Sequence, residues 1–220
     1  MNPHKYTIFL YWLLIASGTA LAAAIVWDQG LLLKIFILDN TRICAFIAFC
    51  FVGGTLLAGW RSLYLSRQAE YLDQIQRNPR RVQFEPGQSI CWDYLSHHDP
   101  MAKASEGQLL AEVMAEEARG NHQIGWFLAG LMIKLGLLGT VVGFVMMLAT
   151  LQGISTLDVK DIQGVMAQTT GGMGVAMYTT LVGLVGSILM GLQYILLDRF
   201  ADGLVACAVR FAHVFNQAKG

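Results

Sequence analysis

The chain has 220 residues, of which 55% are hydrophobic and only 14% are charged. Soluble domains carry about 25% charged residues, so this composition argues against a soluble globular protein. Lys plus Arg and Asp plus Glu each number 15, so the formal net charge is zero and no nucleic acid or other polyanionic partner is implied.

The apolar residues fall into four blocks, and each approaches the roughly 20 mostly apolar residues that a membrane-spanning helix needs. Backbone amides in lipid must be satisfied within their own segment, so each block is predicted to be a helix. The fold class is therefore predicted to be an all-α integral membrane protein, with four transmembrane helices and cytoplasmic helical extensions. The predicted spans are Thr7–Trp27, Ile43–Trp60, about Ile124–Leu151 and Met173–Leu197.

The first predicted span is expected to remain in the protein as a membrane anchor. Lys5 precedes its apolar run and the TALAAA stretch resembles a cleavage site, which are features of a signal peptide. The apolar run is nevertheless longer than the about 7–15 residues of a signal peptide's hydrophobic region.

Basic residues are concentrated between the second and third spans, where residues 61–124 contain seven of them. The short loops 28–42 and 152–172 hold only three together. The excess of Lys and Arg in cytoplasmic loops predicts that residues 61–124 are cytoplasmic. Four spans then place both chain termini in the cytoplasm.

The cytoplasmic loop is predicted to hold helices and not a catalytic domain. Arg61–Gln76 should continue the second span, and the RNPRRVQFEPG stretch, with its two prolines, should form a turn. Residues 101–119 are strong helix formers that lead with little break into the third span. The tail from Asp198 to Lys219 repeats apolar residues at helical spacing and is expected to extend the fourth span.

No residues have the spacing of a catalytic or metal site. His97, His98 and Asp99 are the one cluster of possible metal ligands, but adjacent histidines on a loop diverge and no further ligand lies at a familiar spacing. His122 and His213 stand alone and are expected to be surface residues. We therefore expect no metal, no cofactor, no catalytic residue and no enzymatic activity.

Small and hydroxyl-bearing residues form one stripe along each of the last two spans, recurring every three or four residues and so sharing one helix face. Small residues let helices approach closely, so both stripes could be packing seams whose hydroxyls bond to the preceding turn of their own helix. The GGMG stretch at 171–174 is expected to form the external entry to the fourth span, where bare backbone permits a tight turn. The stripe residues are Gly136, Thr140, Gly143, Met147 and Thr150 in the third span, and Met173, Met177, Thr180, Leu184, Ser187, Gly191 and Tyr194 in the fourth.

Thr140 and Thr180 are predicted to lie at one depth, roughly 15 Å below the outer membrane surface at about 1.5 Å per residue. A polar constriction in a pore requires hydroxyls at the same depth, whereas a contact that only packs two helices together does not. The shared depth therefore favours an ion pathway. No Asp, Glu, Arg or His lies in either stripe, so an ion-carrying carboxylate must come from another polypeptide. Thr179 joins the predicted ion-pathway residues, although it is expected to face the third span of its own or an adjacent subunit.

Two motifs, KLGLLGTVVGF at 134–144 and GVAMYTTLVGL at 174–184, resemble the paired motifs of the MotA/TolQ/ExbB proton-channel family. The resemblance covers roughly residues 125–200. It implies that the two helices line a central pore in a homopentamer, around a dimer of a single-span MotB/TolR/ExbD-like partner whose membrane Asp carries the ion. It places Thr140 and Thr180 on the threonines thought to face that Asp.

The chain departs from the family pattern in ways that leave its branch open. Many TolQ- and ExbB-like members have a Glu three residues before the span-four threonine, where this chain has Met177. All four prolines lie outside the spans, unlike the pore prolines of the flagellar branch. Four spans with both termini inside are more similar to MotA than to the three-span TolQ and ExbB.

The sequence thus predicts the pore-forming subunit of a proton- or sodium-driven motor or stator in the bacterial inner membrane. Two other functions stay open: a structural membrane scaffold, and a small-solute transporter with its site between the third and fourth spans. The predicted regions are transmembrane helices 1 and 2 at 1–60, a cytoplasmic helical loop at 61–124, pore-lining helices 3 and 4 at 125–197, and a cytoplasmic amphipathic helix at 198–220. The predicted pore-facing or partner-contact residues are Gly136, Gly143, Met147, Met177, Leu184 and Ser187.

Overall fold

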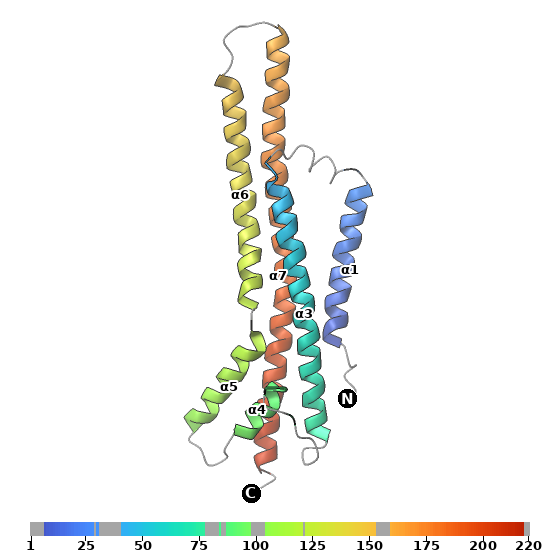
Figure 1. The fold of residues 1–220 in the computed structure, drawn as a ribbon, viewed down its shortest axis with the longest axis vertical. Helices are drawn as coiled ribbons and strands as arrows, with labels where there is room; N and C mark the ends of the chain where they lie inside the picture. The colour runs from blue at the N-terminus through green and yellow to red at the C-terminus, as the bar shows by residue number, and fades with distance from the viewer. Residues whose placement is uncertain are drawn as a thin grey trace. The chain divides into compact units, whose positions relative to one another are not determined.

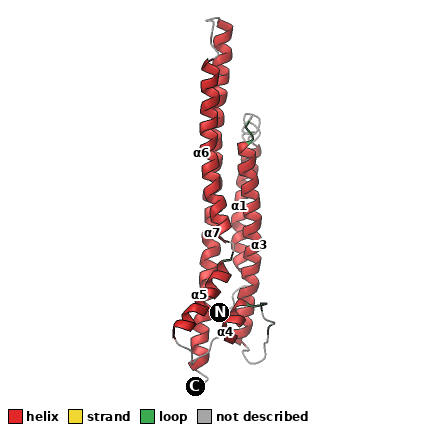
Figure 2. Ribbon diagram, turned by 60° about the vertical axis from the view of Figure 1, so that its left-hand side comes forward, coloured by secondary structure: helices red, strands yellow, loops and turns green. Residues whose placement is uncertain are grey.

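The computed structural model describes residues 7–28, 30, 41–77, 84, 87–97, 104–120, 122–152 and 159–217 (Figure 1). These residues form six α-helices and no strand (Figure 2), which confirms the predicted all-α fold class. Four of the described helices are long and apolar enough to cross a membrane, as the sequence predicts. The helices are α1 (Thr7–Asp28), α3 (Ile43–Arg77), α4 (Ile90–His97), α5 (Ala104–Arg119), α6 (His122–Gln152) and α7 (Val159–Gln217).

The chain divides into two compact units, and four of the helices contribute to both. The first unit comprises Met1–Ile15, Leu57–Gln123 and Gln193–Gly220, and therefore includes α4 and α5. The second unit comprises Ala16–Leu56 and Ile124–Leu192, and therefore includes both predicted stripes up to Gly191.

Two of the predicted helical extensions are confirmed. Helix α3 continues from its apolar part to Arg77 without a break, and α7 continues to Gln217. The predicted external loop at 28–42 and the turn at 77–87 lie mostly outside the described residues, and His98 and Asp99 lie wholly outside them.

The start of α7 corrects two expectations. The loop predicted at 152–172 is too long, because α7 begins at Val159. The tight turn predicted at 171–174 is wrong for the same reason, since GGMG lies within the helix. Glycine disfavours helices in water by about 1 kcal/mol relative to Ala. Its small size, however, permits the close contact with α6 described below.

Helix α4 lies where the sequence pattern predicts no helix. The hydroxyl oxygen of Ser89 accepts the N–H of Trp92 at 3.3 Å, which makes Ser89 the N-cap. The buried Gln68 side chain of α3 accepts the N–H of Ile90 and donates to the carbonyl oxygen of Gln88, both at 3.2 Å. A helix of this length is marginal alone, so the distant Gln68 and the core below stabilise it.

The end of α5 is fixed by a glycine and by a side chain of α3. Gly120 has a φ of +48°, the left-handed conformation that commonly ends a helix. The Arg61 guanidinium donates to the carbonyl oxygens of Glu117 and Ala118 at 2.7 and 2.8 Å, which satisfies acceptors that have no partner within the helix. Helix α6 then begins at His122, so the short break predicted here is confirmed.

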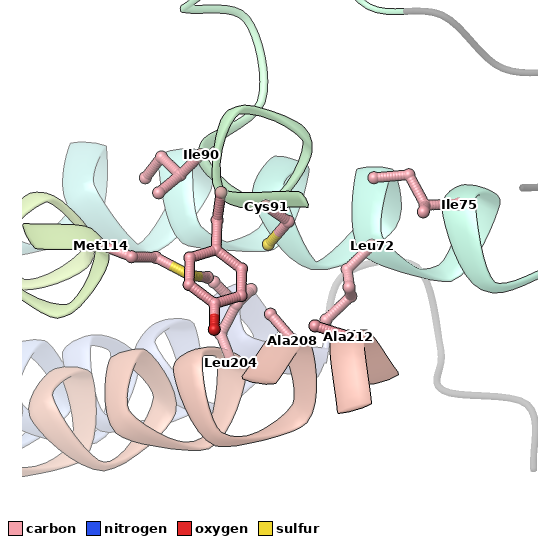
Figure 3. Close-up of a cluster of buried hydrophobic side chains, with 9 residues drawn as sticks. Leu72, Ile75, Ile90, Cys91, Met114, Leu204, Ala208 and Ala212 are labelled. Atoms are coloured by element: carbon pink, nitrogen blue, oxygen red, sulfur yellow. The ribbon is translucent and has the colours of Figure 1, made fainter. Parts of the chain in front are cut away.

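A cluster of buried apolar side chains joins α3, α4, α5 and α7 in the first unit (Figure 3). Its members are at most 6% exposed. Burial of apolar surface from water, worth roughly 25 cal/mol per Å², is the force that holds such a cluster together. The cluster consists of Leu72, Ile75, Ile90, Cys91, Tyr94, Met114, Leu204, Ala208 and Ala212.

This packing predicts which cysteine reacts with a thiol reagent. Cys207 is exposed, whereas Cys44, Cys50 and Cys91 are buried. Burial also raises the pKa of the Cys91 thiol to about 12, so at about pH 8 it is not a thiolate, the reactive form. We expect N-ethylmaleimide to modify Cys207 alone in the folded protein and all four cysteines after denaturation, as measured by mass spectrometry. Cys207→Ser is the control, and labelling of Cys91 at the rate of Cys207 would contradict the packing.

Candidate functional site

Helices α6 and α7 approach each other closely at glycines in the second unit. A Cβ atom on Gly143 would lie 2.6 Å from the carbonyl oxygen of Gly172 and 2.8 Å from the backbone nitrogen of Ala176. A Cβ atom on Gly136 would lie 3.1 Å from the carbonyl oxygen of Thr179. Glycine therefore fits where larger residues would force the backbones apart, which is how small residues bring membrane helices together.

Thr179 lies inside this contact. Its side chain is fully buried and occupies the space beside Gly139 of its own chain. Its hydroxyl donates to the carbonyl oxygen of Val175 at 2.8 Å. Thr179 thus faces the third predicted span, the orientation that the sequence predicts, and has a packing position with no exposed surface.

Thr180 lies at the edge of the same contact. Its hydroxyl is shared between the carbonyl oxygen of Ala176, at 3.1 Å, and that of Gly136 in α6, at 3.3 Å. The residue is only partly buried. Because the one hydroxyl hydrogen is directed to backbone carbonyls, the remaining capacity of the oxygen is that of an acceptor.

Thr140 is also partly buried, and its hydroxyl donates to the carbonyl oxygen of Leu137 at 2.5 Å. Thr180 lies opposite Gly136, and Thr140 follows Gly136 by four residues, about 6 Å along α6. The two hydroxyls are therefore about one helical turn apart along the helix pair. Their predicted position at one depth in the membrane thus holds only to within about one turn.

Both threonines border the side of the α6–α7 pair that faces away from α3. In the second unit, α3 contacts α6 at Leu128 and α7 at Gly186. Successive residues of a helix are about 100° apart around its axis. On α6, Leu128 therefore lies on one side of the contact with α7 and Thr140 on the other. On α7, Gly186 and Thr180 likewise lie on opposite sides of the contact with α6. The antiparallel course of the helices brings Thr140 and Thr180 to the same side of the pair.

The predicted pore-facing residues separate into two groups. Met177 and Leu184 are 63% and 50% exposed and flank Thr180 on its helix face, and Met147 is partly buried. Gly136 and Gly143 are instead covered by α7 of their own chain, and Ser187 is 8% exposed. The structure therefore gives the two glycines a contact within the chain, which differs from the partner contact that the sequence predicts.

A group of charged side chains in the first unit was not expected. His122 is buried, with 4% of its side chain exposed, and the prediction that it is a surface residue is wrong. Its Nδ1 lies 2.6 Å from Oδ1 of Asp198 in α7. The neighbouring pair of Arg119 and Asp202, at 2.8 Å, is about half exposed on both sides, where an ion pair contributes only about 0–1 kcal/mol.

Helices of this length and apolarity, together with the family comparison, define a multi-pass membrane protein. The model of the MotA/TolQ/ExbB proton channel family matches residues 92–207, more than half of the chain, and the chain belongs to that family. The match extends beyond the two motifs into α4 and α5 on one side and along α7 on the other. No curated protein and no solved structure matches the chain.

The close contact of α6 and α7 can be tested with a pair of glycine variants. Gly143→Ala places a methyl group against the backbone of α7, whereas Gly130→Ala meets nothing within 4 Å. We expect Gly143→Ala to destabilise the protein by about 1–3 kcal/mol, the usual cost of overpacking, and Gly130→Ala to be neutral. Reversible unfolding in mixed detergent micelles measures both. Equal stability of the two variants would be inconsistent with the described contact.

Proposed function

We propose that this chain is the pore-forming subunit of an ion-driven membrane motor or stator complex. It conducts protons, or sodium ions, together with a single-span partner that supplies an ion-carrying Asp. Membership of a proton channel family supports this proposal. The structural observation that carries it is that Thr140 and Thr180 present hydroxyl oxygens on the same side of the α6–α7 pair, away from α3.

The ion pathway in this proposal consists of Thr140 and Thr180, and Thr179 supports it from inside the α6–α7 contact. The hydroxyl oxygens offer lone pairs, which accept a hydrogen bond from a protonated carboxyl group or bind a cation. Around Thr180, Met177 and Leu184 are exposed and apolar. They would contact the partner helix and keep its surroundings poor in water, which strengthens electrostatic interactions there.

The partner must bring the titratable group, because neither stripe contains Asp, Glu, Arg or His. In the proposed assembly, five copies of the chain surround a dimer of a MotB/TolR/ExbD-like partner in the bacterial inner membrane. Helices α6 and α7 face the dimer, and α1 and α3 lie outside them against lipid. Both chain termini and residues 61–124 are cytoplasmic, as the distribution of basic residues favours.

The proposal is tested by removing the hydroxyl of Thr180. Thr180→Val keeps the shape of the side chain but removes the acceptor oxygen. We expect partner-dependent ion flux into liposomes to fall by about twofold to tenfold, as for loss of one hydrogen bond worth about 0.5–1.5 kcal/mol. The partner is sought in the neighbouring reading frame and co-purified with the chain.

Two further variants control this experiment. Thr180→Ser keeps the hydroxyl and should retain most of the flux. Thr170→Val removes an exposed hydroxyl that, like Thr180, bonds to the carbonyl four residues before it, and should change nothing. Absence of flux in every form, with intact assembly, would favour a scaffold. Flux by the purified chain without any partner would favour a solute transporter.

A further inference from the structure

His122 belongs to the same helix as Thr140, and Asp198 belongs to the same helix as Thr180. His122 and Thr140 are 18 residues apart in α6, and Thr180 and Asp198 are also 18 residues apart in α7. At 3.6 residues per turn, 18 residues make about five complete turns. Each helix is continuous over this interval, so each carries one threonine and one member of the His–Asp pair.

The His–Asp pair has a defined hydrogen-bond polarity. A carboxylate only accepts hydrogen bonds, so in the neutral pair Nδ1 of His122 donates to Oδ1 of Asp198 across the 2.6 Å contact. Nε2 then carries the lone pair. This nitrogen is buried and has no hydrogen-bond partner among the described residues, which is costly for a polar atom unless a water or an incoming group bonds to it.

We infer that His122, held by Asp198, accepts the transported proton at the end of α6 and α7 that the topology places in the cytoplasm, and passes it to water there. This inference rests on the proposed function. No Asp, Glu, Arg or His lies between His122 and Thr140 or between Thr180 and Asp198, so His122 and Asp198 are the first such residues from the threonines toward that end of the chain's two helices. His122 is the accepting group, and Asp198 is a positioning residue that fixes its tautomer.

The proton balance of this step is simple. The lone pair of Nε2 forms an N–H bond as an O–H bond of a hydrated proton breaks, which leaves an imidazolium beside the Asp198 carboxylate. The proton then leaves from Nε2 to a cytoplasmic water, and the neutral imidazole returns. About 30% of the Asp198 side chain is exposed, so the pair lies close to the surface of the first unit.

The charges around His122 favour passage of the proton over its retention. Burial is the largest of the effects that disfavour the imidazolium; Asp198 of α7 attracts it, and Arg61 of α3 and Arg119 of α5 repel it. The neutral Tyr194 ring of α7 packs edge-on, with ring centroids 6.1 Å apart. Burial and the two arginines thus oppose the attraction by Asp198, so the imidazolium can release its proton again in each cycle.

The first test observes the proton directly and needs no partner. The full chain, labelled with ¹⁵N-histidine in lipid nanodiscs, is titrated from about pH 8 to about pH 5, the range in which histidine changes charge. His122→Asn identifies the His122 signals by their disappearance. We expect Nε2 to change from a bare to a protonated nitrogen while Nδ1 stays protonated. A His122 that keeps one form throughout would overturn the inference.

The second test measures flux by the complex with its partner. In His122→Asn, the amide nitrogen replaces Nδ1 as donor to Asp198 but cannot carry a proton. We expect proton flux to fall by about tenfold or more, within the range for loss of one proton-transfer group, with assembly intact. The wild-type dependence of flux on internal pH should disappear. Asp202→Asn, which breaks the exposed pair with Arg119, is the matched control and should conduct normally.

The outcomes separate this inference from the proposed function. Loss of flux in Thr180→Val, with normal flux and pH dependence in His122→Asn, would leave the proposed function standing and overturn the inference. A wild-type complex that conducts no ions would overturn both. Loss of flux and of pH dependence in His122→Asn, with a normal Asp202→Asn, supports the inference, because a purely structural hydrogen bond survives in the Asn variant.

Discussion

The close approach of α6 and α7 at their glycines is the constraint on which the site depends. In lipid, apolar side chains gain little by leaving their surroundings, so membrane helices associate through close packing and interhelical hydrogen bonds. Gly136 and Gly143 allow both here: the backbones meet, and the Thr180 hydroxyl reaches the carbonyl oxygen of Gly136. The same closeness sets which faces of the two helices stay open. The stripes can therefore serve both as a packing contact and as part of an ion pathway. The packing contact between α6 and α7 holds Thr140 and Thr180 at its edge.

The first unit is held by different forces. Its helices bury an apolar cluster against one another, and polar side chains of α3 fix where short helices begin and end. Gln68 holds the start of α4 and Arg61 caps α5. Gly120 then turns the chain directly into α6, whose first residue is His122.

The elements that could be predicted from sequence are those with a strong local signal. The apolar lengths of α1, α3 and α6 gave the spans, and the orientation of Thr179 follows from helical periodicity. Helix α4 escaped prediction because its start depends on Gln68, 22 residues before Ile90. The early start of α7 escaped prediction because GGMG has low helix propensity in water, while Gly172 of this stretch contacts α6. His122 was misjudged because its burial depends on Asp198, 76 residues away.

The direction of the threonine hydroxyls affects which protonation state of a carboxyl group can be accommodated beside them. Thr140 and Thr180 both donate their hydroxyl hydrogens to backbone carbonyls, so their oxygens can only accept a further hydrogen bond. An ionised carboxylate would find there no hydrogen bond to compensate for its lost hydration, whereas a protonated carboxyl group would find one. In the assembly that we propose, the partner's carboxyl group is therefore better accommodated beside these threonines when it is protonated and neutral. In that assembly, the carboxyl group would then keep its proton for as long as it faces these threonines.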